Sequence, residues 1–139
     1  MANKENKYLE RNVNYYETDM MGVVHHSNYI RWFEEARVIW LKKQGIPYDK
    51  IEEDGVQIPV IGVSCEYKNP AKFGDVICVE AYTKEITGVK FIIGYVVKNE
   101  STGTILAIGE TKHCFVNSDF RPVNLKKFKP EIYEKISEV

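Results

Sequence analysis

YETDMMGVVHHSNY, residues 16–29, is the stretch that decides the fold and the chemistry expected of this chain. It places an acidic residue, a glycine and two histidines directly before a helical pattern. Ser27 or Asn28 is a good N-cap and Gly45 suits the position after a helix end, so we expect a helix over residues 29–44. A helix start offers free backbone N–H groups and a partial positive charge. A carboxylate facing that start can act on a carbonyl whose oxygen the N–H groups bind.

The predicted helix has one wide apolar face, which is typical of a helix wrapped by a sheet. This face carries Tyr29, Ile30, Trp32, Phe33, Ala36, Ile39 and Trp40. Arg37 falls within the same face. Because a buried arginine needs an acidic or carbonyl partner, we expect an internal ion pair for Arg37.

The rest of the chain alternates turn signals with strand-like segments. These segments cover residues 8–16, 56–68, 75–86, 90–98 and 104–117. The fourth is apolar on both faces, which predicts a central strand covered on both sides. We expect a linker over residues 47–55 and a short last helix over residues 130–137. One strand, a long helix and four antiparallel strands predict an α+β fold, in a single domain over residues 1–139.

Composition excludes several classes of protein. Hydrophobic residues make up 44% of the 139 positions, and 19 basic against 20 acidic side chains leave a net charge of -1. This composition argues against disorder and against a general nucleic-acid binder. Cys65, Cys78 and Cys114 form no C-x-x-C pair, so we expect reduced core cysteines. No apolar run has the length of a membrane span and the N-terminus has no signal-peptide pattern, so we expect a cytoplasmic protein.

Glu17 and Asp19 leave two interpretations open. Two acids separated by one residue suggest an acid/base couple, but residues at this spacing need not converge in a loop. Spacing alone favours a structural acid that accepts hydrogen bonds from nearby N–H groups. The apolar residues 20–24 favour a functional one, because an acid embedded among apolar side chains is costly unless it is paired or used.

His25 and His26 are equally compatible with capping and with catalysis. A metal site would need further ligands at fixed spacing, and no such pattern accompanies Asp19, His113 or these histidines, so we expect none. A Ser-His-Asp triad is conceivable, but no serine lies in G-x-S-x-G. The sequence also contains no P-loop and no G-x-G-x-x-G.

Four motifs, in this order, resemble the hotdog-fold acyl-CoA thioesterases of the 4-hydroxybenzoyl-CoA thioesterase superfamily. They are residues 17–29, residues 33–37 (FEEAR), residues 69–75 (NPAKFGD), and residues 115–117 (FVN) followed by 121–123 (RPV). The resemblance implies a hotdog fold, in which a five-stranded antiparallel sheet wraps around a long central helix. It also implies a homodimer or homotetramer with active sites at subunit interfaces.

The resemblance also implies roles for individual residues. Asp19 matches the family's catalytic aspartate, and His26 matches the position whose backbone N–H faces the thioester oxygen. Tyr15 has the spacing of an assisting tyrosine, although the local run is one residue shorter than in the nearest subgroup, so Tyr16 is the alternative.

The expected substrate is an acyl-CoA, whose thioester is hydrolysed without a metal or other cofactor, because coenzyme A is part of the substrate itself. We assign substrate binding to Gly22, Val24, Asn28, Tyr29, Lys72 and Lys90, with the lysines available for phosphates. Two alternatives remain: a hotdog protein that binds acyl-CoA without turnover, and a thioesterase or dehydratase acting on acyl carrier protein. Fold alone does not decide between them.

Overall fold

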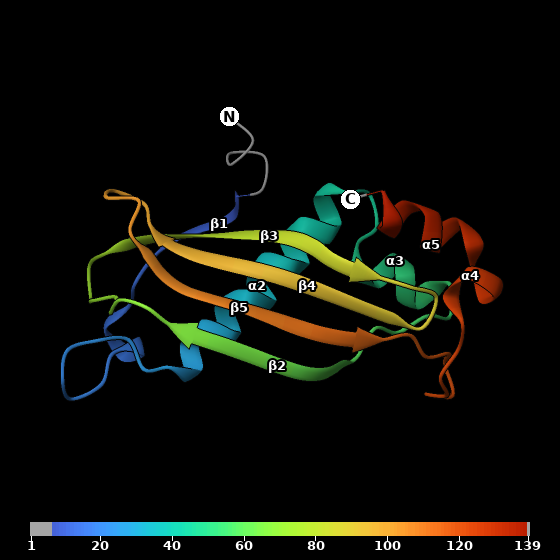
Figure 1. Cartoon of the computed structure of the whole chain (residues 1–139), viewed down its shortest axis with the longest axis horizontal. Helices are drawn as coiled ribbons and strands as arrows, with labels where there is room; N and C mark the ends of the chain where they lie inside the picture. Colours follow the sequence, from blue (N-terminus) through green and yellow to red (C-terminus); the bar gives the residue numbers. More distant parts are fainter. Residues whose placement is uncertain (1–6, 139) are drawn as a thin grey trace.

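The computed structural model describes residues 7–138, which form one five-stranded antiparallel sheet with a long helix against one face (Figure 1). The strands are β1 (Lys7–Asn12), β2 (Val60–Tyr67), β3 (Val76–Ile86), β4 (Lys90–Asn99) and β5 (Ile105–Cys114). Their order in the sheet is β1-β3-β4-β5-β2. The prediction that the segment beginning at Lys90 is the central strand is therefore confirmed.

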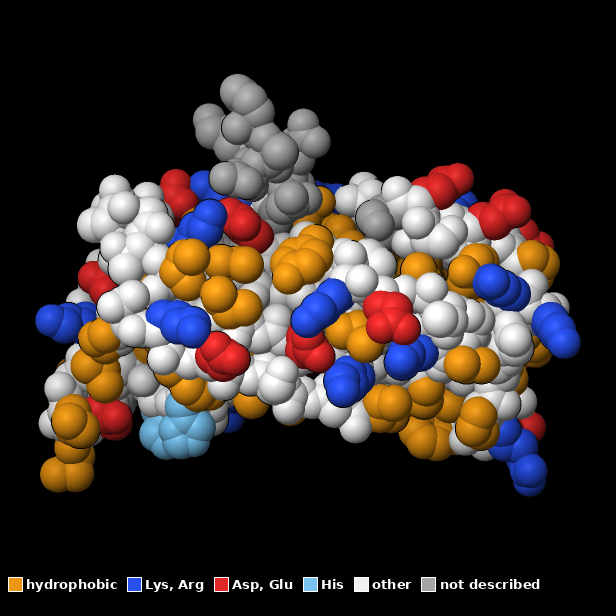
Figure 2. All heavy atoms as spheres, viewed as in Figure 1, with side chains coloured by type: hydrophobic (Ala, Val, Ile, Leu, Met, Phe, Trp, Pro, Cys, Tyr) orange, Lys and Arg blue, Asp and Glu red, His pale blue; other side chains and the backbone are white. Residues whose placement is uncertain are grey.

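Helix α2 (Ser27–Lys43) lies obliquely behind the sheet in Figure 1. Its buried face includes Trp32, Phe33, Ala36 and Trp40, and the Phe33 ring stacks on Tyr95 of β4 with centroids 4.4 Å apart. The sheet therefore wraps around α2, as the apolar face of the helix predicts. The opposite face of the sheet, shown in Figure 2, mixes charged and hydrophobic side chains.

Three short helices, α3 (Tyr48–Glu53), α4 (Leu125–Phe128) and α5 (Pro130–Ser137), lie at one end of the sheet, opposite the loop that precedes α2 (Figure 1). The prediction of a linker over residues 47–55 is wrong, because α3 occupies most of it and buries Ile51 in the core. Helix α4 was also not predicted. The Asn124 side chain starts α4 by accepting a hydrogen bond from the backbone N–H of Lys126.

The first strand ends earlier than its predicted last residue, Tyr16. Strand β1 stops at Asn12, and Tyr15–Glu17 form a 3-10 turn, η1. The Glu17 carboxylate closes this turn by accepting the backbone N–H of Asn14 at 2.8 Å. A local side-chain bond thus replaces the strand ladder at this point.

Arg37 is buried as predicted, but its expected ion pair is absent among the described residues. Its guanidinium instead donates to the hydroxyls of Tyr48, at 2.8 Å, and Tyr95, at 3.2 Å. The Tyr95 hydroxyl lies 2.8 Å from Thr111 Oγ1, which lies 2.8 Å from His113 Nε2. Hydroxyl groups therefore satisfy the arginine inside the core.

Candidate active site

The loop before α2 folds into a small hairpin. Thr18 pairs with Val24, and the backbone N–H of Asp19 donates to the Val23 carbonyl at 2.8 Å. Gly22 closes the turn with a bond from its N–H to the Asp19 carbonyl at 3.0 Å, and its φ of 82° is a backbone angle that glycine adopts without strain. Asp19 is thereby held as the first residue of the turn, and it lines the same pocket as His26 at the start of α2.

The expectation that Asp19 is embedded among apolar side chains is wrong for the single chain. Asp19 is exposed, and Met20 and Met21 extend into solvent with exposed fractions of 103% and 85%. Among the described residues, the Asp19 carboxylate makes only a local bond, accepting the Met21 N–H at 2.8 Å. The buried acid is Glu17, which is 3% exposed, because the turn folds Glu17 inward and the hairpin carries Asp19 outward.

His26 is the N-cap residue of α2. Within residues 7–138 its backbone N–H has no hydrogen-bond acceptor, so this donor is available at the positive end of the helix. Its carbonyl accepts a hydrogen bond from the Tyr67 hydroxyl of β2 at 3.2 Å. The His26 imidazole stacks on His25 with ring centroids 4.1 Å apart, and histidine atoms reach the surface near the end of β2 in Figure 2.

A pocket of about 350 Å³ brings the acid and the helix start together. Its lining residues are Asp19, Val23, Val24, His26, Tyr29, Tyr67, Lys68, Asn69 and Pro70. Burial is the main cause that raises the pKa of Tyr29 to about 12. Tyr67 is 46% exposed, and the partial loss of its hydration, followed by a side-chain hydrogen bond with Cys65, raises its pKa to about 12. Both phenols therefore stay protonated near neutral pH, and the Tyr67 hydroxyl remains a hydrogen-bond donor.

Of the residues assigned to the site from the sequence, Asp19, His26, Val24 and Tyr29 line this pocket. Gly22 forms the turn. Asn28 is buried beneath the loop, where its side-chain amide donates to the Glu17 carbonyl at 3.0 Å.

Tyr15 is 75% exposed and lies edge-on against Phe73, outside the pocket lining. Lys72 pairs through its backbone with Val23, beside the loop. Lys90 begins β4 at the opposite end of the sheet and forms an ion pair with Glu85 at 3.2 Å. One chain therefore does not bring Lys90 to the pocket.

Sequence reasoning missed Tyr67 as a pocket residue. Lys68, which was not among the residues assigned to the site, also lines the pocket. The signal lay in residues 69–70 (Asn-Pro), which end β2 beside the start of α2. The pairing of β2 with β5 places β2 at the sheet edge. The hydrogen bond from the Tyr67 hydroxyl to the His26 carbonyl shows that the end of β2 faces the loop.

Within residues 7–138, no group of three or more His, Cys, Asp or Glu side chains is arranged to hold a metal ion. Metal independence stays a prediction. The same part of the chain contains no helix long and apolar enough to cross a membrane.

Residues 13–136 match the family model described as the thioesterase-like superfamily. The chain belongs to this superfamily. Its relatives include a "Putative esterase" of Aquifex aeolicus, 41% identical over 78% of this chain and 83% of the relative. A "Putative acyl-CoA thioesterase YneP" of Bacillus subtilis is 32% identical over 91% of this chain and 94% of the relative.

Among solved structures, the DHNA-CoA thioesterase from Staphylococcus aureus superposes with a TM-score of 0.86 and is 30% identical. The match covers 94% of this chain and 87% of that chain. The predicted superfamily and hotdog fold are thus confirmed, and the chain is a thioesterase by family. The family match does not assign roles to Asp19, His26 or Tyr15, which stay predictions.

Proposed function

We propose that this thioesterase hydrolyses acyl-CoA to a free carboxylic acid and CoA, with Asp19 as nucleophile or general base. The start of α2 at His26 polarises the thioester carbonyl. The observation that carries the proposal is the shared pocket, which Asp19 and His26 both line, together with the His26 N–H, which has no acceptor within residues 7–138. Relatives named for action on CoA thioesters support the same substrate class.

The chemistry needs few groups because a thiolate leaves readily. With Asp19 as base, a water oxygen bonds to the thioester carbon while its proton passes to the carboxylate. The C–S bond then breaks, and the CoA thiolate takes up a proton. With Asp19 as nucleophile, its oxygen bonds to the carbon, the thiolate leaves, and water hydrolyses the resulting anhydride. In both routes the His26 backbone N–H at the helix start stabilises the oxyanion.

A second copy of the chain is the partner that we propose for the sheet edge at β2. The two edges differ: β1 carries the charged residues Lys7, Glu10 and Arg11, whereas β2 exposes apolar side chains. The exposed apolar residues of β2 are Val60, Ile61, Val63 and Tyr67, and Ser64 and Glu66 are exposed beside them. An exposed apolar edge strand is a template for pairing with another strand, and charges on an edge oppose it. Pairing at β2 would bring the partner close to Tyr67, and so to the pocket.

A hydrolysis panel tests the proposed activity. The purified chain is mixed with short, long and aromatic acyl-CoAs and with an acyl carrier protein thioester, and release of free thiol is followed by absorbance. We expect turnover of at least one CoA ester. Binding of CoA esters without turnover would instead support the non-catalytic alternative. Turnover of the carrier-protein thioester alone would contradict CoA as the substrate carrier.

A further inference from the structure

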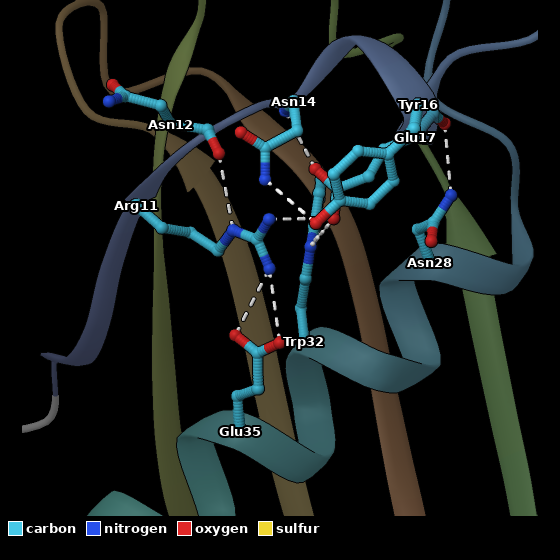
Figure 3. Close-up of polar contacts among 8 residues, drawn as sticks. All are labelled: Arg11, Asn12, Asn14, Tyr16, Glu17, Asn28, Trp32 and Glu35. Atoms are coloured by element: carbon cyan, nitrogen blue, oxygen red, sulfur yellow. Dashed lines mark hydrogen bonds and ion pairs between the residues drawn. The ribbon is translucent and has the colours of Figure 1, made fainter.

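Glu17 is a buried carboxylate that joins three segments of the chain (Figure 3). Its Oε2 lies 2.8 Å from Arg11 Nη2 on β1 and accepts the indole N–H of Trp32 on α2 at 3.1 Å. Its Oε1 accepts the backbone N–H of Asn14 at 2.8 Å. A carboxylate removed from water is stable only when such donors replace its hydration, and here a strand, a turn and a helix each supply one.

The backbone of Glu17 is tied to the helix start as well. Its carbonyl accepts the backbone N–H of His25 at 2.8 Å and the side-chain amide of Asn28 at 3.0 Å. These two donors lie on either side of His26 in the sequence, and Figure 3 shows Asn28 reaching the loop from the first turn of α2. Asp19 follows Glu17 by two residues. A single residue therefore anchors the chain at the point where the acid and the helix start meet.

We propose that Glu17 is a positioning residue that sets the placement of Asp19 relative to the His26 N–H. The inference rests on the proposed function of these two groups. Glu17 does not line the pocket; it acts through the hairpin that carries Asp19 and through the helix start. The carboxylate is required because all of its partners are donors.

Glu17→Gln tests this role, because it keeps the size of the side chain but substitutes an NH₂ group for one acceptor oxygen. The glutamine must turn that NH₂ group either toward Trp32 and Arg11 or toward Asn14. In both orientations the NH₂ group faces an N–H donor that the carboxylate accepted. We expect kcat to fall by roughly 10²-fold, as for a displacement of about 1 Å in a catalytic group, with little change in KM.

Two variants control for lost charge and lost stability. Glu35→Gln removes the exposed second partner of Arg11, 3.1 Å away, and touches neither the loop nor the pocket. Ile136→Ala destabilises the core from α5, at the other end of the sheet. Both should keep kcat near the wild-type value at a temperature well below unfolding, even though Ile136→Ala lowers Tm.

Amide NMR spectra provide a readout that does not depend on turnover. Shifts in Glu17→Gln concentrated in residues 18–26, together with the loss of kcat, support positioning. The proposal is overturned if the amide shifts of residues 18–26 do not change in Glu17→Gln. It is also overturned if Glu17→Gln and Ile136→Ala lose the same Tm and Glu17→Gln loses no more kcat than Ile136→Ala does. If Glu17→Gln does not fold, Arg11→Gln takes its place, because it removes one of the donors to the Glu17 carboxylate. The same two criteria, the loop amide shifts and the loss of kcat, then apply to Arg11→Gln. If the wild type hydrolyses no thioester, the proposed function fails, and the amide shifts still decide whether Glu17 places the loop.

Discussion

Glu17 and Asp19 are two acids in one short loop, and the structure gives them opposite environments. The sequence left open whether these acids are structural or functional, and the argument from apolar neighbours implied that Asp19 lies among buried side chains. The periodicity of a strand or helix does not extend through a hairpin, so the direction of each loop side chain depends on the bonds that close it. Here the decisive bonds are those of Glu17 to Arg11 and Trp32, which come from elements distant in sequence.

A substitution at His26 distinguishes the role of its backbone N–H from the role of its side chain. His26→Ala removes the imidazole and leaves the N–H at the start of α2. We expect turnover to fall by less than it does in Asp19→Asn, because the oxyanion donor remains. Steady-state kinetics of both variants on the same acyl-CoA provide the comparison. A loss equal to or greater than that in Asp19→Asn would assign the main chemical role to the imidazole.

At the scale of elements, the helix and the strands with clear patterns were predicted to within a few residues. Helix α2 and strand β3 have strong apolar patterns, whereas α3 is a single short helix with only Ile51 fully buried. Its sequence between Pro47 and Gly55 is indistinguishable by pattern from a polar linker. Packing of Ile51 into the core, which the sequence does not show, stabilises α3.

The contact between α2 and β5 depends on Gly109. A Cβ atom at this position would lie 2.6 Å from the Phe33 ring and 2.6 Å from the Ser64 carbonyl oxygen. Gly109→Ala should therefore lower the free energy of unfolding by about 1–3 kcal/mol, as measured by denaturant titration. Gly62→Ala is the matched control, since its Cβ would meet only Lys112 side-chain atoms at 3.6 Å or more. Equal stability of the two variants would contradict close packing at Gly109.

For the molecule as a whole, the buried network that ends at His113 predicts a dependence of stability on pH. Burial, with Arg37 nearby, lowers the His113 pKa from 6.5 to about 4. Well above pH 6.5 the imidazole is neutral in both the folded and the unfolded state, so it does not change stability. As the pH falls from 6.5 toward 4, the unfolded chain binds a proton that the folded chain does not, so stability falls by on the order of 3 kcal/mol.

Denaturant titrations across this pH range test the prediction, with His113→Gln as the comparison. The variant should lose much of the slope between pH 6.5 and 4, because glutamine does not titrate. An unchanged slope would show that other groups cause the acid sensitivity of the fold.

The apolar edge at β2 predicts association of whole chains. Light scattering at micromolar concentration should give at least twice the mass of one chain, and Val63→Glu should lower it, because a charge on an edge strand opposes pairing. Val89→Glu is a control, since Val89 is exposed in the hairpin between β3 and β4. A stable monomer for the unmodified chain would contradict the proposed interface.

The whole architecture was more predictable than the site. Alternating apolar residues and one helix with a wide apolar face are enough to predict an α+β sheet around a helix, and the motif order predicted the superfamily. The pocket joins a loop before α2 to the end of β2, residues 19–29 to residues 67–70. That junction depends on strand order, so the sequence did not reveal Tyr67 as a pocket residue. Nor did the sequence show that Lys90 lies at the opposite end of the sheet in a single chain.

The central claim is that the Asp19 carboxylate carries out thioester hydrolysis at the start of α2. Its most direct test is the turnover of Asp19→Asn on the best acyl-CoA of the panel, with Tm measured in parallel. Asparagine keeps the size and the hydrogen bonding but removes the charge. We predict that turnover falls by about 10²–10⁴-fold while Tm stays close to the wild-type value. Turnover near that of the wild type in a folded Asp19→Asn protein would contradict the account.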